Sequence, residues 1–545
     1  MTILSNPLPL PYLYEHAQGK ACREAGRPAL IGYKGTYYLF FSGACGFYYS
    51  YDLADWTYHR NIDLGLYQPG ACASVIGERL AFCASSVGKD LCLYLSDDPL
   101  SDQWEKIHLP IACTDPCLFE DRDGRLYLYY SAPVPAKDSF TGQSHQGALF
   151  GVELDRQSFS PVGPAEMLAA PDPEWLGFEA SPTGSASTDA LHSPFMNRWH
   201  GRYYLQYAGQ GGEGVYTSSD PLGPFYPQPG IPYTTIGQGG STMTDIYGNL
   251  WHATRISYYG GHRIALLPAG LDERGILFCD QSFMDYPVTL SEGTLDRGPS
   301  RPSQSLYSYR AAAQAPYSAQ GHDPELIFDE DPHTAWKALD STGACVEGDL
   351  GRVRAVSHIK VDLADLDIPA VEVSDAVKVD GRYIDMDLKQ TVEYILEGSV
   401  DGSGYEILKH PVQTNLSHAC ISFTSPKDLR FIRLTAKVLP YDQDFAVSGL
   451  RVFGPPQGPA PETVKTVTAE TLGDRRLKLS WEPSSYAIGY RIRYGIRPDS
   501  LYGSVTVHET TSVELPLLHA GFHYFAAVDA FGEGGLTEGP AQRIS

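Results

Sequence analysis

Short runs of alternating apolar and polar residues, separated by glycine turns, dominate the first 290 residues. In five places a turn glycine precedes a run rich in Tyr, Leu and Phe, residues that suit a pleated, half-buried surface. A glycine between two apolar runs indicates a hairpin, because the turn requires a positive φ. We therefore predict five hairpins, around Tyr33-Lys-Gly35-Thr-Tyr-Tyr, Ile76-Gly77-Glu-Arg-Leu, Asp123-Gly124-Arg-Leu-Tyr, His200-Gly201-Arg-Tyr-Tyr and Tyr247-Gly248-Asn-Leu-Trp.

The spacing of these glycines indicates a repeat. The intervals between them are 42, 47, 77 and 47 residues, and a period of about 40 to 50 residues that contains hairpins is typical of propeller blades. We explain the long third interval by an insertion at roughly residues 133–190, which are rich in Pro, Ser and Gly. Because a helical period is almost absent, we predict an all-β fold with a five-bladed β-propeller over residues 1–298.

Two proline-containing linkers divide the rest of the chain, Ser300-Arg-Pro-Ser and Pro455-Pro-Gln-Gly-Pro. Short alternating strands resume after each of them, so we predict two β-sandwich domains, residues 299–455 and 461–545. Trp336 is expected in the core of the first sandwich. No motif requires a cofactor. A structural calcium could lie at Asp329-Glu-Asp331, for which a solvated acidic loop is the simpler interpretation, and Cys113-x-x-x-Cys117 lacks the second close pair that a zinc site needs.

The net charge and the composition restrict the classes of molecule that the chain is expected to bind. With 41 basic and 65 acidic residues the net charge is −24, which repels nucleic acid and anionic lipid. No apolar run reaches the roughly 20 residues of a membrane span, and the N-terminus lacks the pattern of a signal peptide, so we expect a cytoplasmic protein. The ten irregularly spaced cysteines are expected to be buried thiols. Nothing in the pattern indicates an oligomeric state.

A candidate site follows from aligning the repeats. In a propeller the innermost strand of each blade lines the central channel, and its first residues open into the mouth. Three of these segments carry a proline seven or eight residues before the turn glycine: Arg27-Pro28, Asp115-Pro116 and Ser193-Pro194. Aligned on the proline, Arg27, Asp115 and the pair His192-Ser193 surround one axis and would hold a small polar ligand. Alternatively, Asp115 only caps the turn before Pro116.

The ordered motifs resemble glycoside hydrolase family 43 over residues 6–290. The resemblance is carried by Arg23-Glu-Ala-Gly-Arg-Pro, Thr114-Asp-Pro-Cys-Leu-Phe and Ser241-Thr-x-x-Asp-x-Tyr-Gly-Asn-x-Trp-His252. Residues 325–454 are similar to a discoidin domain and residues 461–545 to fibronectin type III. The resemblance implies a propeller that hydrolyses pentoside or similar linkages with inversion, using a general base and a general acid on opposite sides of the sugar.

This chain departs from the family at several of the implied site positions. The base position holds Arg27, which cannot accept a proton, and the acid position holds His192. The family's histidine before the blade-five Gly-Ser is Gly239. Asp115 keeps the position that tunes the acid and orients substrate, and Arg255 is similar to a substrate-contacting arginine. Phe47 and Gln206 complete the set of residues that we expect to bind the substrate.

Two interpretations follow for an oligosaccharide or glycoside partner. In the first, the chain is a glycosidase in which His192, with a reference pKa of about 6.5, is the acid, as is thought for a related propeller family that acts on agar oligosaccharides. Its base would be Glu179 of Leu176-Gly-Phe-Glu179, with Glu24 and Asp189 as weaker choices. In the second, hydrolysis is lost and the chain is a glycan-binding pseudoenzyme. The positive charge of Arg27 beside His192 suits a uronate. A purely structural adhesion protein, with an empty propeller, is a third hypothesis.

Overall fold

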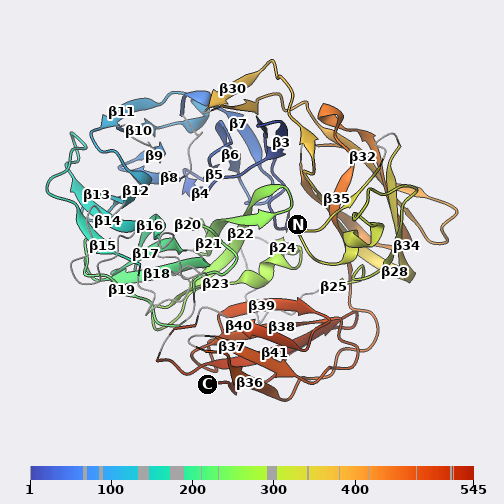
Figure 1. Ribbon diagram of the computed structural model, residues 1–545. Coiled ribbons are helices and arrows are strands. Elements are labelled where there is room, and N and C mark those ends of the chain that lie inside the picture. Colours follow the sequence, from blue (N-terminus) through green and yellow to red (C-terminus); the bar gives the residue numbers. More distant parts are fainter. Residues whose placement is uncertain are drawn as a thin grey trace.

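The computed structural model describes residues 2–64, 70–84, 90–132, 147–171, 190–209, 211–230, 232–290, 304–339, 343–379, 381–414, 416–473, 476–515, 518–519 and 521–545. Regular structure in this part of the chain is nearly all β-strand. The helical elements are short 3-10 turns, η1 (Ile62–Leu64), η2 (Pro99–Ser101), η3 (Gln281–Met284), η4 (Pro324–Phe328) and η5 (Pro440–Asp442). The fold is a five-bladed β-propeller followed by two β-sandwich domains, as predicted (Figure 1).

Each blade is a sheet of four antiparallel strands in chain order. The strands are β4 (Ala29–Tyr33), β5 (Thr36–Phe40), β6 (Gly46–Ser50) and β7 (Thr57–Arg60) in blade one; β8 (Ala71–Ile76), β9 (Arg79–Ala84), β10 (Leu91–Ser96) and β11 (Glu105–Leu109) in blade two; β12 (Thr114–Glu120), β13 (Leu126–Ala132), β14 (Ala148–Leu154) and β15 (Glu166–Ala169) in blade three; β16 (His192–Trp199), β17 (Arg202–Gly209), β18 (Gly212–Ser218) and β19 (Tyr226–Pro227) in blade four; and β20 (Gly240–Thr244), β21 (Leu250–Tyr258), β22 (Gly261–Leu271) and β23 (Leu277–Cys279) in blade five. The first strands contact one another in the ring β4, β8, β12, β16, β20 and back to β4, so they line the channel.

The five turn glycines have positive φ, from 63° at Gly77 to 86° at Gly248, which confirms the hairpins. The predicted insertion at residues 133–190 is partly wrong, because β14 and β15 of blade three lie inside it. The many tyrosines of the repeats serve as core residues, with Tyr127 and Tyr204 among the fully buried side chains. The strand β1 (Thr2–Leu4) pairs with β24 (Val288–Leu290), so the two ends of the propeller region are joined.

The second domain is built on one strongly bent sheet around its own core. Its strands are β25 (Ser305–Leu306), β26 (Ala312–Gln314), β27 (Trp336–Lys337), β28 (Cys345–Leu363), β32 (Val392–Ser399), β33 (Glu406–Thr414), β34 (His418–Val438) and β35 (Ala446–Gly454). Trp336 is fully buried in this core, as expected. At the calcium candidate, Glu330 is ion-paired with Arg451 at 2.9 Å. The described residues contain no cluster of metal-ligating side chains there or elsewhere.

The propeller and the second domain share a sheet that the sequence did not reveal. Its order is β29-β3-β2-β31-β30, so a hairpin from the N-terminal part of the chain lies between strands of the second domain. The strands are β2 (Tyr14–Ala17), β3 (Lys20–Arg23), β29 (Ile368–Pro369), β30 (Ala376–Val379) and β31 (Arg382–Asp385). Residue 298 therefore does not separate two independent structural units.

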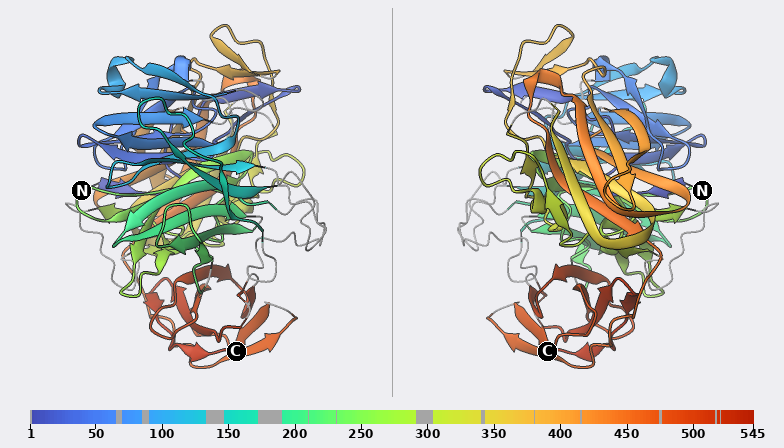
Figure 2. Two further views of the ribbon diagram at one scale, coloured as in Figure 1. Left: turned by 90° about the vertical axis from the view of Figure 1, so that its left-hand side faces the viewer. Right: turned by 90° about the vertical axis from the view of Figure 1, so that its right-hand side faces the viewer.

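The third domain is a sandwich of two sheets that packs against both other parts (Figure 2). One sheet contains β36 (Val467–Thr471), β37 (Leu477–Trp481) and β40 (Ser512–Leu515), and the other β38 (Gly489–Gly495), β39 (Gly503–His508), β41 (Phe525–Gly532), β42 (Gly535–Thr537) and β43 (Gln542–Arg543). The ring of Tyr502 stacks on Phe278 of blade five with centroids 4.2 Å apart. The ten cysteines, all within the described ranges, are free thiols. No described helix is long and apolar enough to cross a membrane.

Candidate functional site

In two blades the site residues lie in a bulge at the start of the first strand. In blade three the register between β12 and β13 shifts between Thr114 and Cys117, and in blade four the register between β16 and β17 shifts between His192 and Phe195. Inside these bulges Asp115 and Ser193 have φ of 50° and 53°, a conformation that non-glycine residues adopt at an energetic cost and that often occurs at functional sites. The bulges turn both residues toward the propeller axis.

Arg27 and Asp115 form the centre of the site. Arg27 Nη1 donates to both carboxylate oxygens of Asp115, each at 2.8 Å, and both side chains are largely buried. The backbone N–H of Ser193 also donates to Asp115, at 3.1 Å. Asp115 therefore does more than cap its own turn, because it connects blades one, three and four. The alignment on proline placed these residues correctly.

Arg255 brings a second guanidinium to the mouth, close to His192. Burial, followed by the charges of Arg27 and Arg255, lowers the pKa of His192 to about 3. A side chain with this pKa is unprotonated at neutral pH, so the general-acid role predicted for His192 is not supported. The pKa of Arg255 is itself lowered by burial and by Arg27, although Glu24 and Asp115 oppose the shift.

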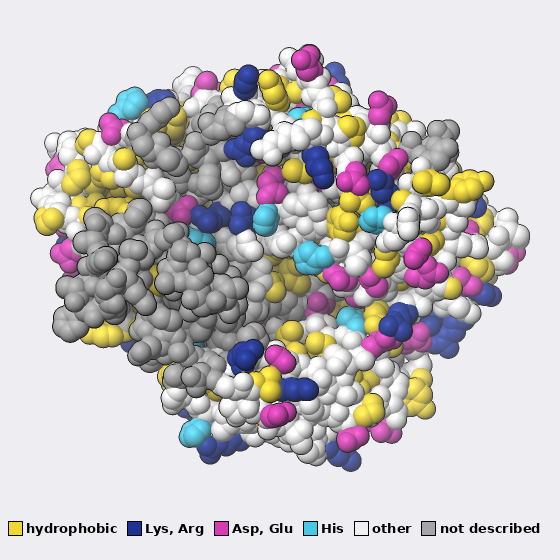
Figure 3. Space-filling view, viewed as in Figure 1, with side chains coloured by type: hydrophobic (Ala, Val, Ile, Leu, Met, Phe, Trp, Pro, Cys, Tyr) yellow, Lys and Arg dark blue, Asp and Glu magenta, His cyan; other side chains and the backbone are white. Residues whose placement is uncertain are grey.

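Several polar atoms at this mouth are buried without a hydrogen-bond partner in the described structure: Arg27 Nε, Arg255 Nε, His192 Nδ1 and Ser193 Oγ. Buried polar atoms are normally paired, so a group of unpaired ones indicates a place for a polar ligand or water. A cavity of about 20 Å³ lies among Arg27, Asp115 and Ser193. That volume accepts one water or one small polar group. Basic, acidic and histidine side chains lie side by side over the middle of the propeller (Figure 3).

Gly239 makes room for Arg27. A Cβ atom at this position would lie 2.7 Å from Ser193 Oγ and 3.0 Å from Arg27 Cδ, and the φ of Gly239 is +94°. A side chain at position 239 would therefore overlap the arginine. The arginine at position 27 and the glycine at position 239 are thus physically linked.

Gln206 belongs to a buried network below the mouth, and its contact with substrate stays a prediction. It is 1% exposed, and its Oε1 accepts a hydrogen bond from Thr242. In the same network Glu213, which the sequence analysis missed, accepts from the backbone N–H of Gly239 at 2.9 Å and lies 2.9 Å from His252 Nε2. The sequence signal that could have identified Glu213 was its position as a charged residue between two glycines of a strand. Glu213 holds the segment that carries Gly239.

The structure contradicts the prediction that Phe47 contacts the substrate. Its ring is fully buried between blades one and two, where it stacks on His59 at 4.7 Å and contacts Phe40. A ring in that position stabilises the blade interface and cannot reach a ligand. Glu179, the predicted base, and Asp189 lie outside the described residues.

A histidine–carboxylate pair lies beside the mouth. Glu24 contacts His262 Nδ1, and its second oxygen accepts the backbone N–H of His262 at 2.8 Å. Burial raises the pKa of Glu24, but the hydrogen bonds from His262 outweigh it and the pKa is lowered. Glu24 was a weak candidate in the sequence; its partner was not foreseen.

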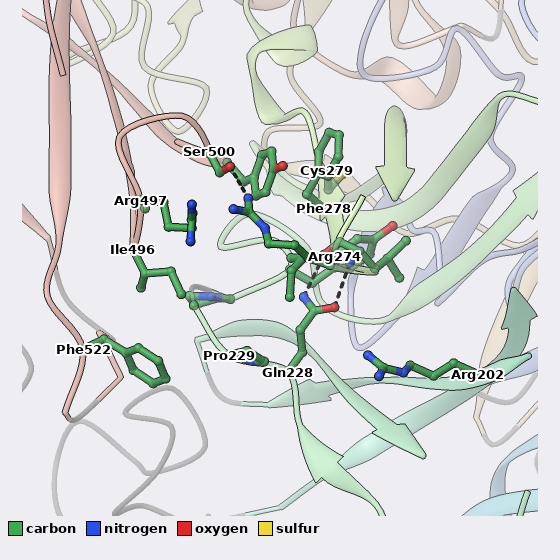
Figure 4. A pocket seen from close by; sticks show the side chains of 17 residues that line it. Arg202, Gln228, Pro229, Arg274, Phe278, Cys279, Ile496, Arg497, Ser500 and Phe522 are labelled. Atoms are coloured by element: carbon green, nitrogen blue, oxygen red, sulfur yellow. Dashed lines mark hydrogen bonds between the residues drawn. The ribbon is translucent and has the colours of Figure 1, made fainter. Parts of the chain in front are cut away.

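A larger cavity, about 380 Å³, lies elsewhere, between blades four and five and the third domain (Figure 4). Apolar side chains line much of this cavity, and some of its polar side chains form hydrogen bonds within the protein. Arg274 donates to Ser500, and Gln228 donates to the carbonyl of Leu277 at 2.8 Å. Of the predicted site residues that the structure describes, none lines this cavity.

Comparison with known proteins gives similarity of structure alone. No protein family model and no curated protein sequence matches the chain. Similar solved structures include a xylan β-1,4-xylosidase of Bacillus halodurans C-125, with 14% identity over 83% of this chain and 99% of the other and a TM-score of 0.40. The Bacteroides ovatus xyloglucan PUL protein GH43B has 11% identity, coverage of 99% and 98%, and a TM-score of 0.41. An exo-1,5-α-L-arabinanase from a bovine ruminal metagenomic library has 18% identity, coverage of 48% and 98%, and a TM-score of 0.35.

Proposed function

We propose that the chain is a glycoside hydrolase-like, carbohydrate-binding protein whose propeller mouth binds the carboxylate of an acidic sugar. The observation that carries the proposal is the group of unpaired buried atoms on Arg27, Arg255, His192 and Ser193. Guanidinium and hydroxyl groups donate to carboxylate oxygens, and hydrogen bonds to charged groups are the strong ones. The saccharide part of the proposal rests on the family 43-like motifs.

Hydrolysis by the family's carboxylate pair is a weaker candidate. Asp115 is held in its ion pair with Arg27, and His192 is neutral at working pH because its pKa is about 3. A hydrolytic pair needs one carboxyl group that donates a proton and one that activates water. Binding of the sugar therefore explains the described residues better than hydrolysis through Asp115 and His192.

The test compares matched ligands by calorimetry. We expect a short uronic acid oligosaccharide to bind at least tenfold tighter than its methyl ester, since a charged hydrogen bond contributes about 1.5–3 kcal/mol and 1.4 kcal/mol is a factor of ten. Arg255→Gln removes this preference, whereas Arg122→Gln, the same change of charge at an exposed turn, leaves it intact. Equal affinity for acid and ester contradicts the proposal. Release of a saturated sugar that Asp115→Asn abolishes would establish the hydrolytic alternative.

A further inference from the structure

The pair Glu24–His262 has the arrangement of a general base. Glu24 is held by two contacts to His262, at Nδ1 and at the backbone N–H, and its lowered pKa keeps it ionised. A carboxylate at Nδ1 stabilises the tautomer with the proton on that nitrogen, which leaves the lone pair of Nε2 available. Both side chains are about one-third exposed, 32% for Glu24 and 28% for His262.

Strand register places this pair next to the carboxylate-binding arginines. In blade five Ser257 lies opposite His262, and Arg255 lies opposite Ile264. Arg255 and His262 therefore lie on the same sheet face as diagonal neighbours, a spacing that long side chains can bridge. Glu24 is close enough to Arg255 to raise its pKa.

The second domain fixes both members of the pair. Asp365 accepts hydrogen bonds from Arg23, the residue before Glu24, and from Arg263, the residue after His262. Arg263 also donates to the backbone carbonyl of Arg23. The two chain segments are thus clamped together at the point where the proposed base is formed, and a clamped base is well suited to proton transfer.

We propose that His262, positioned by Glu24, catalyses β-elimination on the acidic sugar bound at this mouth; the inference rests on the proposed function. Arg27 and Arg255 neutralise the sugar carboxylate, which acidifies the C5–H bond and stabilises the charge that develops on proton removal. His262 Nε2 takes the C5 proton, the electron pair forms the C4=C5 double bond, and the C4–O bond breaks. The leaving oxygen receives the proton from the imidazolium. No water, metal or oxidant is consumed.

Elimination matches the described residues better than hydrolysis does. It requires cations at the substrate carboxylate and one base, and it does not require two catalytic carboxyl groups. The first of those requirements coincides with the arginine at position 27. Asp115 then serves to orient Arg27 through its ion pair.

The experiment uses the full chain and 4-linked oligouronides. We expect products with the ultraviolet absorbance of an α,β-unsaturated carboxylate and, by mass spectrometry, one water lighter than hydrolysis products. His262→Ala is expected to lower kcat at least 100-fold, the usual contribution of a general base, with oligouronide affinity within about twofold. The exposed-histidine control His108→Ala retains full activity.

A positioning role for Glu24 has its own readout. Glu24→Gln is expected to lower kcat at least tenfold with KM within about twofold, whereas a merely structural defect would change KM and thermal stability together. His262→Gln guards against misfolding of the alanine variant and is expected to be equally inactive.

Three outcomes overturn the inference: oligouronide binding with no turnover, products that are saturated, or turnover that survives both His262 variants. In each of these the binding proposal stands. Failure of oligouronides to bind overturns both proposals, so the two failures are distinguishable.

Discussion

Asp365 is the buried charge on which the join between propeller and second domain depends. Its carboxylate receives Arg23 Nε at 3.0 Å, the Arg23 backbone N–H at 2.9 Å and Arg263 Nη2 at 2.9 Å. All three side chains are at most 1% exposed. Asp365→Asn keeps the shape of the residue but leaves two guanidinium groups buried with no counter-charge.

The magnitude follows from that arrangement. Removing one partner of a buried ion pair destabilises a protein by about 3–5 kcal/mol, a large part of a typical total of about 5–15 kcal/mol. The assay is urea unfolding of the full chain, followed by tryptophan fluorescence and circular dichroism. The matched control is Asp375→Asn, which breaks an exposed pair with Arg60 between the same two domains. Exposed pairs contribute at most about 1 kcal/mol.

The pH dependence has a definite sign. Burial raises the pKa of Asp365, but Arg23 and Arg263 outweigh it and the pKa is lowered. The stabilisation is therefore present above the unfolded-state pKa of about 3.9 and is lost as the pH falls through the lower folded-state value. If Asp365→Asn and Asp375→Asn destabilise the chain equally at pH 7, the reasoning about the buried clamp is refuted.

Three further predictions concern the mouth and the third domain. Because the pKa of His192 is lowered to about 3, the unfolded chain binds its proton first as the pH falls below about 6.5. The free energy of unfolding should therefore fall between pH 7 and pH 4.5 by roughly 2 kcal/mol less in His192→Gln than in the wild type. An equal fall in the two proteins would contradict this. Gly239→Ala should weaken uronide binding at least tenfold in calorimetry, since its Cβ would displace Arg27; unchanged affinity would show that the arginine does not contact the ligand. Tyr502→Ala removes the stack on Phe278 and the hydrogen bond to Asp272. The free energy needed to open the third domain should fall by about 1–3 kcal/mol, so proteolysis at the linker before this domain should become faster. An unchanged cleavage rate would argue against this contact.

The fold was largely predictable because its signals are local. Each turn glycine, such as Gly77 or Gly248, marks a hairpin by its own backbone requirement, and the spacing then reveals the blades. The shared sheet was not predictable. Its strands β2 and β31 pair Glu15 with Ile384, and no periodicity connects segments that far apart in sequence.

The site was predictable only where a local motif marked it. The proline that follows Arg27, Asp115 and Ser193 gave the correct alignment, and the ion pair of Arg27 with Asp115 follows from it. Phe47 was misplaced because both faces of a blade are buried against neighbouring blades. Alternation along a strand then cannot separate the channel from the blade interface.

The residues of the mouth depend on one another. An arginine at position 27 needs a partner charge, which Asp115 supplies, and space for its chain, which Gly239 leaves open. Burial lowers the pKa of His192, and the charge of Arg27 lowers it further because it repels a protonated imidazole. An aspartate at position 27 would instead face the carboxylate of Asp115 and leave the space at Gly239 unfilled. The residues therefore stabilise one another, and a carboxylate at position 27 would remove the partner charge of Asp115.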